Sequence, residues 1–243
     1  MINILIPMAG LGSRFSNAGY KKPKPFIDVA GKPMICRVLD NLLIENAKFY
    51  LIAQKEHIFT EHNLVSQIEN DYNAKFIPVN GLTEETACTV LFARKFINNN
   101  RPLLIANSDQ IVDMNIEDFI NDCSKRKLDG SILCFEDPER NPKWSFAKVN
   151  ADKLVTEVQE KNPISNYATV GIYYFSMGKY YVNASIDMII NNDRVNNEFY
   201  TCPVYNYMIK DAKSVGIFNI DFTQMHGIGT PQDLDKYLKV KFE

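Results

Sequence analysis

The sequence predicts an α/β fold in which helices flank a mixed, mainly parallel sheet. From residue 2 to residue 136, short apolar runs alternate with segments of helical spacing, the pattern of a parallel sheet covered by helices. After residue 136 the expected strands are short and follow one another with turn residues between them, which adds antiparallel pieces. The chain has 243 residues, of which 46% are hydrophobic, so one core is expected. We therefore predict a single domain over residues 1–243.

The strands of the first part are read from its apolar runs. "INILIPMA" is continuously apolar, as a strand buried on both faces should be. One helix is expected after Pro33, a residue favoured at helix starts, and another after Asn115, a good N-cap with Asp118 three residues on. The expected strands are 2–9, 47–54, 74–80, 101–112 and 129–136, and the expected helices are 34–46, 62–70, 86–98 and 115–127.

The second part contains shorter expected strands and then helices. The strand-like segments combine apolar and β-branched residues between turn residues. No internal repeat, low-complexity tract or linker interrupts the chain. The expected strands are 144–150, 154–161, 168–175 and 214–221, and the expected helices are 179–192, 199–211 and 230–241.

Composition excludes several classes of protein. The formal charge of −2 argues against a general nucleic-acid binder, which usually carries a basic domain or stripe. No apolar run approaches the ~18 residues of a membrane span, and no secretory leader opens the chain. The five cysteines show no metal-binding spacing and are expected as free thiols in a reducing compartment. We predict a cytoplasmic protein with neither nucleic acid nor membrane as a partner.

A loop of small residues follows the first expected strand and precedes two cations. The stretch "MAGLGSR" lies at the carboxyl end of a strand, where open parallel sheets bind ligands. Small residues let consecutive backbone N–H groups approach an anion. Arg14 can fork two phosphate oxygens, and Lys24, held between Pro23 and Pro25, supplies a point charge. The loop therefore predicts a polyphosphate site.

Two common phosphate motifs do not describe this loop. The P-loop pattern G-x-x-x-x-G-K-[ST] is absent, and Gly10-Leu11-Gly12 is followed by Phe15 where the Rossmann fingerprint requires a glycine. A bare G-x-G is also compatible with a simple strand-to-loop turn. The addition of Arg14 and "KPKP" favours the phosphate interpretation.

The combination "MAGLGSRF…KKPKPFIDVAGKPMI" resembles the signature of the nucleoside-triphosphate-dependent sugar-phosphate nucleotidyltransferases. The similarity continues through "TACTVLFA", "LLIANSDQIVD", "EKNPIS", "VGIYYF" and "GTPQDL". It covers the whole chain and is nearest to a subgroup from bacterial capsule and surface-polysaccharide pathways. It implies a Rossmann-like nucleotide-diphospho-sugar transferase fold of the GT-A type, with a nucleotide-binding half at 1–136 and a substrate-binding half at 137–243.

The resemblance implies that an NTP and a phosphorylated substrate react to give an NDP-substrate and pyrophosphate. Arg14 would hold the β- and γ-phosphates, and Lys24 would bridge the α-phosphate and the incoming phosphate. Ala9 before Gly10 favours a pyrimidine, UTP or CTP, and Glu85 stands where many relatives have a glycine. The residues expected to bind the nucleotide are Met8, Ala9, Gly10, Leu11, Gly12, Ser13, Thr83, Glu85, Thr86, Ala87 and Ser108.

The family pattern places a Mg²⁺-binding aspartate at Asp109, and a turn or capping aspartate is the alternative. Many relatives carry a second metal aspartate before the late G-T-P, where this chain has "MHGIGTP". His226 is the only metal-capable side chain there, although imidazole is a poor ligand for magnesium. An ordinary hydrogen-bonding histidine is the equal alternative.

The lip around "EKNPIS" is the expected substrate site. Lys161 would contact the substrate phosphate and Glu160 a hydroxyl, with the backbone of Gly171 close to the sugar. Taken in isolation, the pair Glu160-Lys161 would instead indicate a solvated charge pair. Trp144 offers an aromatic face, with a packed tryptophan as the equal alternative. Glu198 and Tyr200 complete the expected contacts.

A homodimer is one possible assembly of the chain. Two other functional classes also stay open. A glycosyltransferase of the same broad fold would consume an NDP-sugar, but it usually carries a D-x-D motif where this chain has N-S-D. A non-catalytic nucleotide-binding module is supported by the missing aspartate alone. Release of pyrophosphate would separate the three classes.

Overall fold

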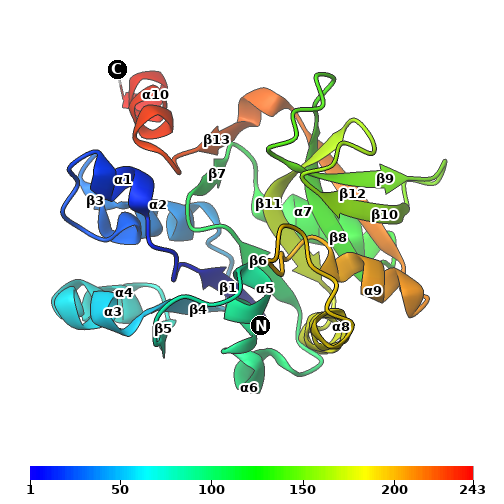
Figure 1. Cartoon of the computed structure of the whole chain (residues 1–243), viewed down its shortest axis with the longest axis horizontal. Coiled ribbons are helices and arrows are strands. Elements are labelled where there is room, and N and C mark those ends of the chain that lie inside the picture. Colours follow the sequence, from blue (N-terminus) through cyan, green and yellow to red (C-terminus); the bar gives the residue numbers. More distant parts are fainter. Residues whose placement is uncertain (243) are drawn as a thin grey trace.

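A twisted sheet of nine strands runs through the middle of the molecule (Figure 1). The computed structural model describes residues 1–242. The order along the sheet is β10-β9-β11-β6-β1-β4-β5. Strand β8 also pairs with β11, along both halves of that strand, and β12 pairs with β8. The strands of the sheet are β1 Ile2–Pro7, β4 Ala47–Gln54, β5 Ala74–Val79, β6 Leu103–Ala106, β8 Gly130–Glu136, β9 Ser145–Val149, β10 Val155–Glu160, β11 Tyr167–Phe175 and β12 Val215–Ile220.

The predicted fold class is confirmed, because a parallel part joins an antiparallel part. Strands β6, β1, β4 and β5 are parallel to one another. Strand β11 is antiparallel to β6, β8 and β9. Strand β8, which the sequence pattern assigned to the parallel series, pairs instead with β11 and β12. Long-range pairing of this kind leaves no signal in the periodicity of a single segment.

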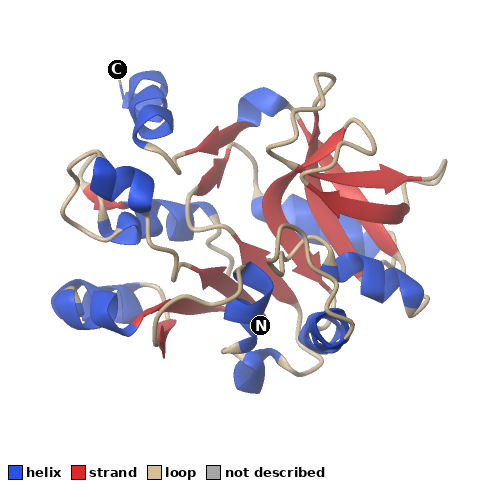
Figure 2. Cartoon of the chain, viewed as in Figure 1, coloured by secondary structure: helices blue, strands red, loops and turns tan. Residues whose placement is uncertain are grey.

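Helices and short ribbons cover both faces and the upper edge of this sheet (Figure 2). The ribbons are β2 Asp28–Val29 with β3 Lys32–Pro33, and β7 Gln110–Val112 with β13 Met225–Gly227. The helices are α1 Ser13–Asn17, η1 Lys24–Phe26, α2 Met34–Asn41, α3 Lys55–Thr60, α4 His62–Asp71, α5 Thr86–Leu91, α6 Arg94–Ile97, α7 Ile116–Lys125, α8 Gly178–Ile190, α9 Val204–Lys210, η2 Phe222–Gln224 and α10 Pro231–Phe242.

Alternation along the central strand β1 divides the apolar core between the two faces. Ile4 belongs to the cluster that includes α2 and α7 residues, whereas Leu5 belongs to the cluster formed with α5, α8 and α9. Successive side chains of a strand point to opposite faces, so a continuously apolar strand supplies both cores. This confirms the interpretation of "INILIPMA" as a strand buried on both sides.

Some expected boundaries shift for local reasons. The predicted helix 86–98 divides into α5 and α6, because the N–H groups of Phe92 and Ala93 bond to carbonyls three residues back and tighten the chain into a 3₁₀-like turn. The predicted strand 101–112 divides into β6 and β7 around the turn at 107–109. The Asn115 cap is confirmed, since its Oδ1 accepts from the N–H of Glu117 at 3.0 Å.

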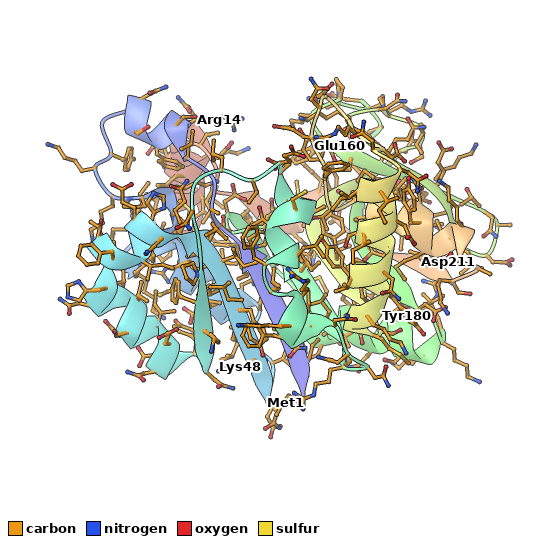
Figure 3. The ribbon with its side chains drawn as sticks, turned by 60° about the horizontal axis from the view of Figure 1, so that its bottom comes forward. Met1, Arg14, Lys48, Glu160, Tyr180 and Asp211 are labelled. Carbon is orange, nitrogen blue, oxygen red and sulfur yellow. The ribbon has the colours of Figure 1, made fainter. Side chains whose placement is uncertain are left out.

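The carboxyl ends of β1 and β6 lie at the same edge of the sheet. In Figure 3, Arg14 and Glu160 stand at this edge, and Met1 and Lys48 lie at the opposite one. The five cysteines are free thiols, as expected. Among the helices of residues 1–242, none is both long and apolar enough to cross a membrane.

Candidate active site

The loop after β1 folds tightly over the segment that carries Lys24. Gly12 has φ +63°, and a Cβ atom there would lie 2.8 Å from Lys24 Cβ. A side chain at Gly12 would therefore both strain the backbone and push Lys24 away. The loop is anchored at Ala9, whose carbonyl accepts from Gln54 Nε2 at 2.8 Å. Glycine is required at position 12 because the backbone of the loop packs directly against the side chain of Lys24.

Six consecutive backbone N–H groups of this loop are free. From Ala9 to Arg14, none has a hydrogen-bond acceptor among residues 1–242. Unpaired N–H groups in a row form a concave donor surface for an anion. The geometry therefore leaves a row of free donors of the kind that a polyphosphate site requires.

The two cations of the loop region are in different states. The Arg14 side chain is exposed and has no ion-pair partner among the described residues. Lys24 Nζ donates to Asp109 Oδ2, and both side chains are largely covered, with exposed fractions of 20% and 25%. A guanidinium is thus open to solvent, while the ammonium and the carboxylate neutralise each other.

These groups line a cavity of about 410 Å³, which we call the loop cavity. A second cavity of about 250 Å³, the lip cavity, adjoins it, and Glu85, Thr86 and Asn107 line both. The expected nucleotide residues in the loop cavity are Met8, Ala9, Gly10, Gly12, Ser13, Thr83, Glu85, Thr86 and Ser108, together with Arg14, Lys24 and Asp109. The expected substrate residues in the lip cavity are Trp144, Glu160, Gly171 and Tyr200.

Two expected nucleotide residues do not line the loop cavity. Leu11 is 61% exposed and lies outside the lining. Ala87 is fully buried, and its N–H donates to the carbonyl of Phe199 at 2.9 Å. Ala87 therefore contributes to packing and loop docking, and its backbone donor is already used.

The junction of the cavities depends on a glycine that sequence reasoning explained only in part. Gly171 has φ +92°, and a Cβ there would lie 2.2 Å from Asn107 Nδ2. The N–H of Asn107 donates to the carbonyl of Gly171 at 3.0 Å. Asn107 precedes Ser108 and Asp109, so its place between the two cavities could have been suspected from the polar turn after the buried strand.

Two glutamates and a lysine are held by hydrogen bonds at the lip cavity. Ser145 donates to Glu160, and Lys161 Nζ donates to the Tyr200 hydroxyl at 2.6 Å. Tyr200 in turn donates to Glu198. Burial raises the pKa of Glu160, and the carboxylates of Glu85 and Glu198 raise it further. Lys161 and Glu198 thus lie behind Tyr200 and do not themselves line the cavity.

Trp144, the aromatic side chain expected to face a sugar, is partly covered by its neighbours. Trp144 packs edge-on against Phe135, with ring centroids 5.3 Å apart, and Lys143 Nζ lies 4.4 Å from its ring. Trp144 therefore serves as packing and as lining at once. Sequence reasoning missed Lys143, Gln110 and Ser145, which line the same cavity, because none has a motif that marks it.

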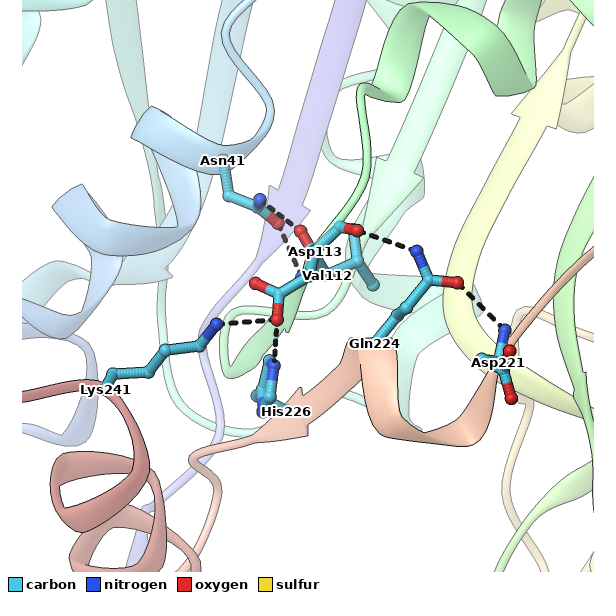
Figure 4. A network of polar contacts seen from close by, with 7 residues as sticks. All are labelled: Asn41, Val112, Asp113, Asp221, Gln224, His226 and Lys241. Carbon is cyan, nitrogen blue, oxygen red and sulfur yellow. Dashed lines mark hydrogen bonds and ion pairs between the residues drawn. The ribbon is translucent and has the colours of Figure 1, made fainter.

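His226 lies in a separate network on β13 (Figure 4). Its Nε2 is 2.7 Å from Asp113 Oδ2, and Lys241 Nζ of α10 is 2.6 Å from the same oxygen. Neither His226 nor Asp113 lines the loop cavity, so the structure does not bring His226 to Asp109 as a second metal ligand. Asp113, which follows β7, ties β13 and α10 to that strand. Burial opposes ionisation of Asp113, but hydrogen bonds from Lys241 and His226 hold its pKa below the ordinary value.

A glycine of the segment that follows β13, Gly229, lies against Asp109. A Cβ at Gly229 would lie 2.5 Å from Asp109 Oδ2, so the "GTP" segment leaves room for that carboxylate.

A sequence model of the family described as nucleotidyl transferase matches residues 4–223. The chain belongs to the nucleotidyl transferase family. The expectation of a nucleotidyltransferase is thereby confirmed at the level of the family.

Relatives of known name agree with membership in the nucleotidyl transferase family. A bifunctional protein GlmU of Methanocaldococcus jannaschii is 26% identical over 98% of this chain and 54% of its own length. A UTP–glucose-1-phosphate uridylyltransferase AglF of Haloferax volcanii is 23% identical over 94% of this chain and 91% of its own. The chain spans about half the length of the GlmU relatives it matches first.

A solved structure shows the same fold. The nucleoside-diphosphate-sugar pyrophosphorylase from Vibrio cholerae superposes with a TM-score of 0.82 at 23% identity, over 97% of this chain and 99% of that chain. At this identity the likeness establishes the fold of the nucleotidyl transferase family and leaves its substrates to the site itself.

Proposed function

We propose that the protein joins an NTP, UTP or CTP, to a phosphorylated sugar or related small phosphate and releases pyrophosphate. The observation that carries the proposal is the pair of adjoining cavities. One is lined by free backbone donors, Arg14 and the Lys24–Asp109 pair, and the other by sugar-binding types of side chain. From the sequence resemblance, we also propose that the protein acts in the cytoplasm and makes precursors of capsule or surface polysaccharide.

The reaction needs positioned charge more than a protein nucleophile. An oxygen of the acceptor phosphate forms a bond to the α-phosphorus, and the bond from that phosphorus to the β-phosphate bridging oxygen breaks, so pyrophosphate leaves with its electron pair. Backbone N–H groups of residues 9–14 and Arg14 would hold the β- and γ-phosphates. Lys24 would face the α-phosphate, and Lys161 the acceptor phosphate. Such groups lower the repulsion between two anions as they meet.

Asp109 fits a magnesium ligand. Magnesium is usually bound by one or two carboxylates together with phosphate oxygens and water, and Asp109 places one carboxylate in the loop cavity. The ion would supply charge for the triphosphate. In this chain Asp109 already bonds Lys24, so nucleotide binding would redistribute this pair and release Lys24 toward phosphate.

The test is a panel of four NTPs against phosphorylated sugars and polyols, with pyrophosphate release as the readout. The expected result is release with a pyrimidine nucleotide and one acceptor class. A matched control is Lys48→Ala at the opposite edge of the sheet, where Lys48 bonds only Asn73, and it should keep full activity. Consumption of an NDP-sugar without pyrophosphate would instead indicate a glycosyltransferase, and nucleotide binding without turnover would indicate a binding module.

A further inference from the structure

Glu85 has a backbone conformation that side chains rarely adopt. Its φ is 74° and its ψ is −172°, a region occupied essentially by glycine alone. The residue immediately precedes α5. Its carbonyl accepts from Thr89 N at 3.1 Å and from the hydroxyls of Thr83 and Thr89 at 3.2 and 3.1 Å. Three donors on one carbonyl hold Glu85 in this conformation.

A second loop clamps the same position from the other side. The N–H of Phe199 donates to the carbonyl of Glu84 at 3.1 Å, and the N–H of Ala87 donates to the carbonyl of Phe199 at 2.9 Å. Arg194 Nη2 lies 2.7 Å from Glu84 Oε2, and its guanidinium lies 4.1 Å from the centroid of the Phe199 ring. The direction of the Glu85 side chain is therefore fixed by two loops.

This fixed side chain lies where the loop cavity and the lip cavity meet. Glu85 lines both, and its Oε1 accepts from the Thr86 hydroxyl at 2.9 Å. No cation within residues 1–242 forms an ion pair with it. Glu160 lines the lip cavity too, so two carboxylates border a space where the protein supplies no ion-pair partner for Glu85. Like charges at close range are unfavourable unless a cation joins them.

A buried donor in the lip cavity indicates that a ligand oxygen is also expected. Gln110 is 6% exposed and lines this cavity. Its Nε2 has no hydrogen-bond partner among the described residues. Buried amide donors are normally satisfied, and a ligand oxygen would complete this one. Lys143 also lines this cavity but forms no ion pair with Glu85 or Glu160, so the cavity suits a ligand that combines a cation with neutral oxygens.

We propose that Glu85 is a specificity-determining residue for the acceptor and that it selects a phosphorylated amino sugar. The ammonium would neutralise Glu85 and Glu160, and a ring or hydroxyl oxygen would accept from Gln110. This inference deepens the proposed function and rests on it. A charge-assisted hydrogen bond is about twice as strong as a neutral one, so an amine should outcompete a hydroxyl at the same carbon.

The experiment compares glucosamine 1-phosphate with glucose 1-phosphate at a fixed NTP. The wild type should favour the amine by about tenfold in kcat/KM. Glu85→Gln keeps the shape but removes the charge, and it should reduce this preference to less than about threefold without changing the KM of the NTP. Glu117→Gln removes an exposed carboxylate of α7 that lines neither cavity, and it should leave the amine-to-hydroxyl ratio as it is.

A glycine variant separates the side chain from the backbone. Glu85→Gly should lose the amine preference as Glu85→Gln does, but it should raise Tm, because glycine adopts this φ and ψ without strain. An unchanged amine-to-hydroxyl ratio in Glu85→Gln would overturn the proposal. A change in the KM of the NTP alone would also overturn it, since Glu85 would then contact the nucleotide.

Calorimetry gives a readout that does not require turnover. The wild type should bind glucosamine 1-phosphate more tightly than glucose 1-phosphate, and Glu85→Gln should bind the two alike. Equal binding by the wild type would sink the amino-sugar proposal even if pyrophosphate is released with other acceptors. A complete lack of pyrophosphate release with preserved amine preference would reject the proposed reaction and leave the role of Glu85 standing.

Discussion

The loop cavity and the lip cavity are built in different ways. The loop cavity takes its donors from the loop of residues 9–14, of which all but Leu11 line it, and adds Lys24 and Asp109. The lip cavity takes its lining from β7, β9, β10, β11 and the loops before α5 and α9. The first is a local structure set on a strand end, and the second exists only after the antiparallel strands have assembled. Donors that suit any triphosphate can come from one short loop, whereas a cavity shaped for one acceptor needs residues from many segments.

The comparison extends to their lysines. Lys24 is paired with a carboxylate directly, while Lys161 bonds a tyrosine hydroxyl that donates to Glu198. Lys24 sits inside the lining, and Lys161 is exposed behind Tyr200. Variants on the two sides should therefore fail by different kinetic parameters.

The largest effect is expected from Asp109→Asn. If Asp109 holds magnesium, losing its charge should reduce pyrophosphate release by at least about 100-fold, because metal charge stabilisation is worth several kcal/mol, and extra Mg²⁺ should restore little. Asp40→Asn, which breaks an exposed ion pair with Lys32, is the control and should keep full activity. Near-native pyrophosphate release by Asp109→Asn would remove the metal assignment.

The two lysines should separate kcat from KM. Lys24→Ala should lower kcat by about 100-fold, since its contact strengthens as charge develops in the transition state. Lys161→Ala should raise the KM of the acceptor by about tenfold and leave the KM of the NTP unchanged. Steady-state kinetics with each substrate varied checks both. A rise in the NTP KM alone for Lys161→Ala would mean that the lip is not the acceptor site.

A smaller loss is expected from Arg14→Lys. An ammonium cannot reproduce the two parallel hydrogen bonds of a guanidinium, so NTP binding and turnover should fall by about tenfold. Arg14 is exposed and has no ion-pair partner within residues 1–242, so Tm should stay the same. Native kinetics after this change would show that the loop is structural only.

The smallest effect concerns Asp113, which lies outside both cavities. Asp113→Asn removes the charge that pairs with Lys241 and His226 and should lower the free energy of unfolding. The loss should be only about 1 kcal/mol, because solvent screens this partly exposed carboxylate. The folded-state pKa of Asp113 is lowered, so its contribution is present above the ordinary pKa of about 4 and is lost as pH falls through the lowered folded pKa. Urea unfolding between pH 7 and pH 2 measures this. A wild-type-minus-variant difference that persists at the lowest pH would contradict the ion-pair explanation.

Sequence reasoning reached the loop cavity more completely than the lip cavity. Gly10, Gly12, Arg14 and Lys24 stand close together in the chain, so their proximity follows from a short loop at a strand end. Gln110 carries no local pattern, and its place in the lip cavity results from pairing between β7 and β13. The pairing of β8 with β11 and β12 likewise depends on segments far away in the sequence.

The sequence by itself determined the α/β class, the double-sided burial of β1, the Asn115 cap and the small-residue loop. Each depends on spacing within one segment or on the conformational freedom of one residue. The tertiary structure alone decided that His226 binds Asp113, that Ala87 is buried, and that Glu85 stands between the cavities. These positions follow from contacts between segments as distant as 84 and 199, and the free energy of such contacts depends on packing that no single segment encodes.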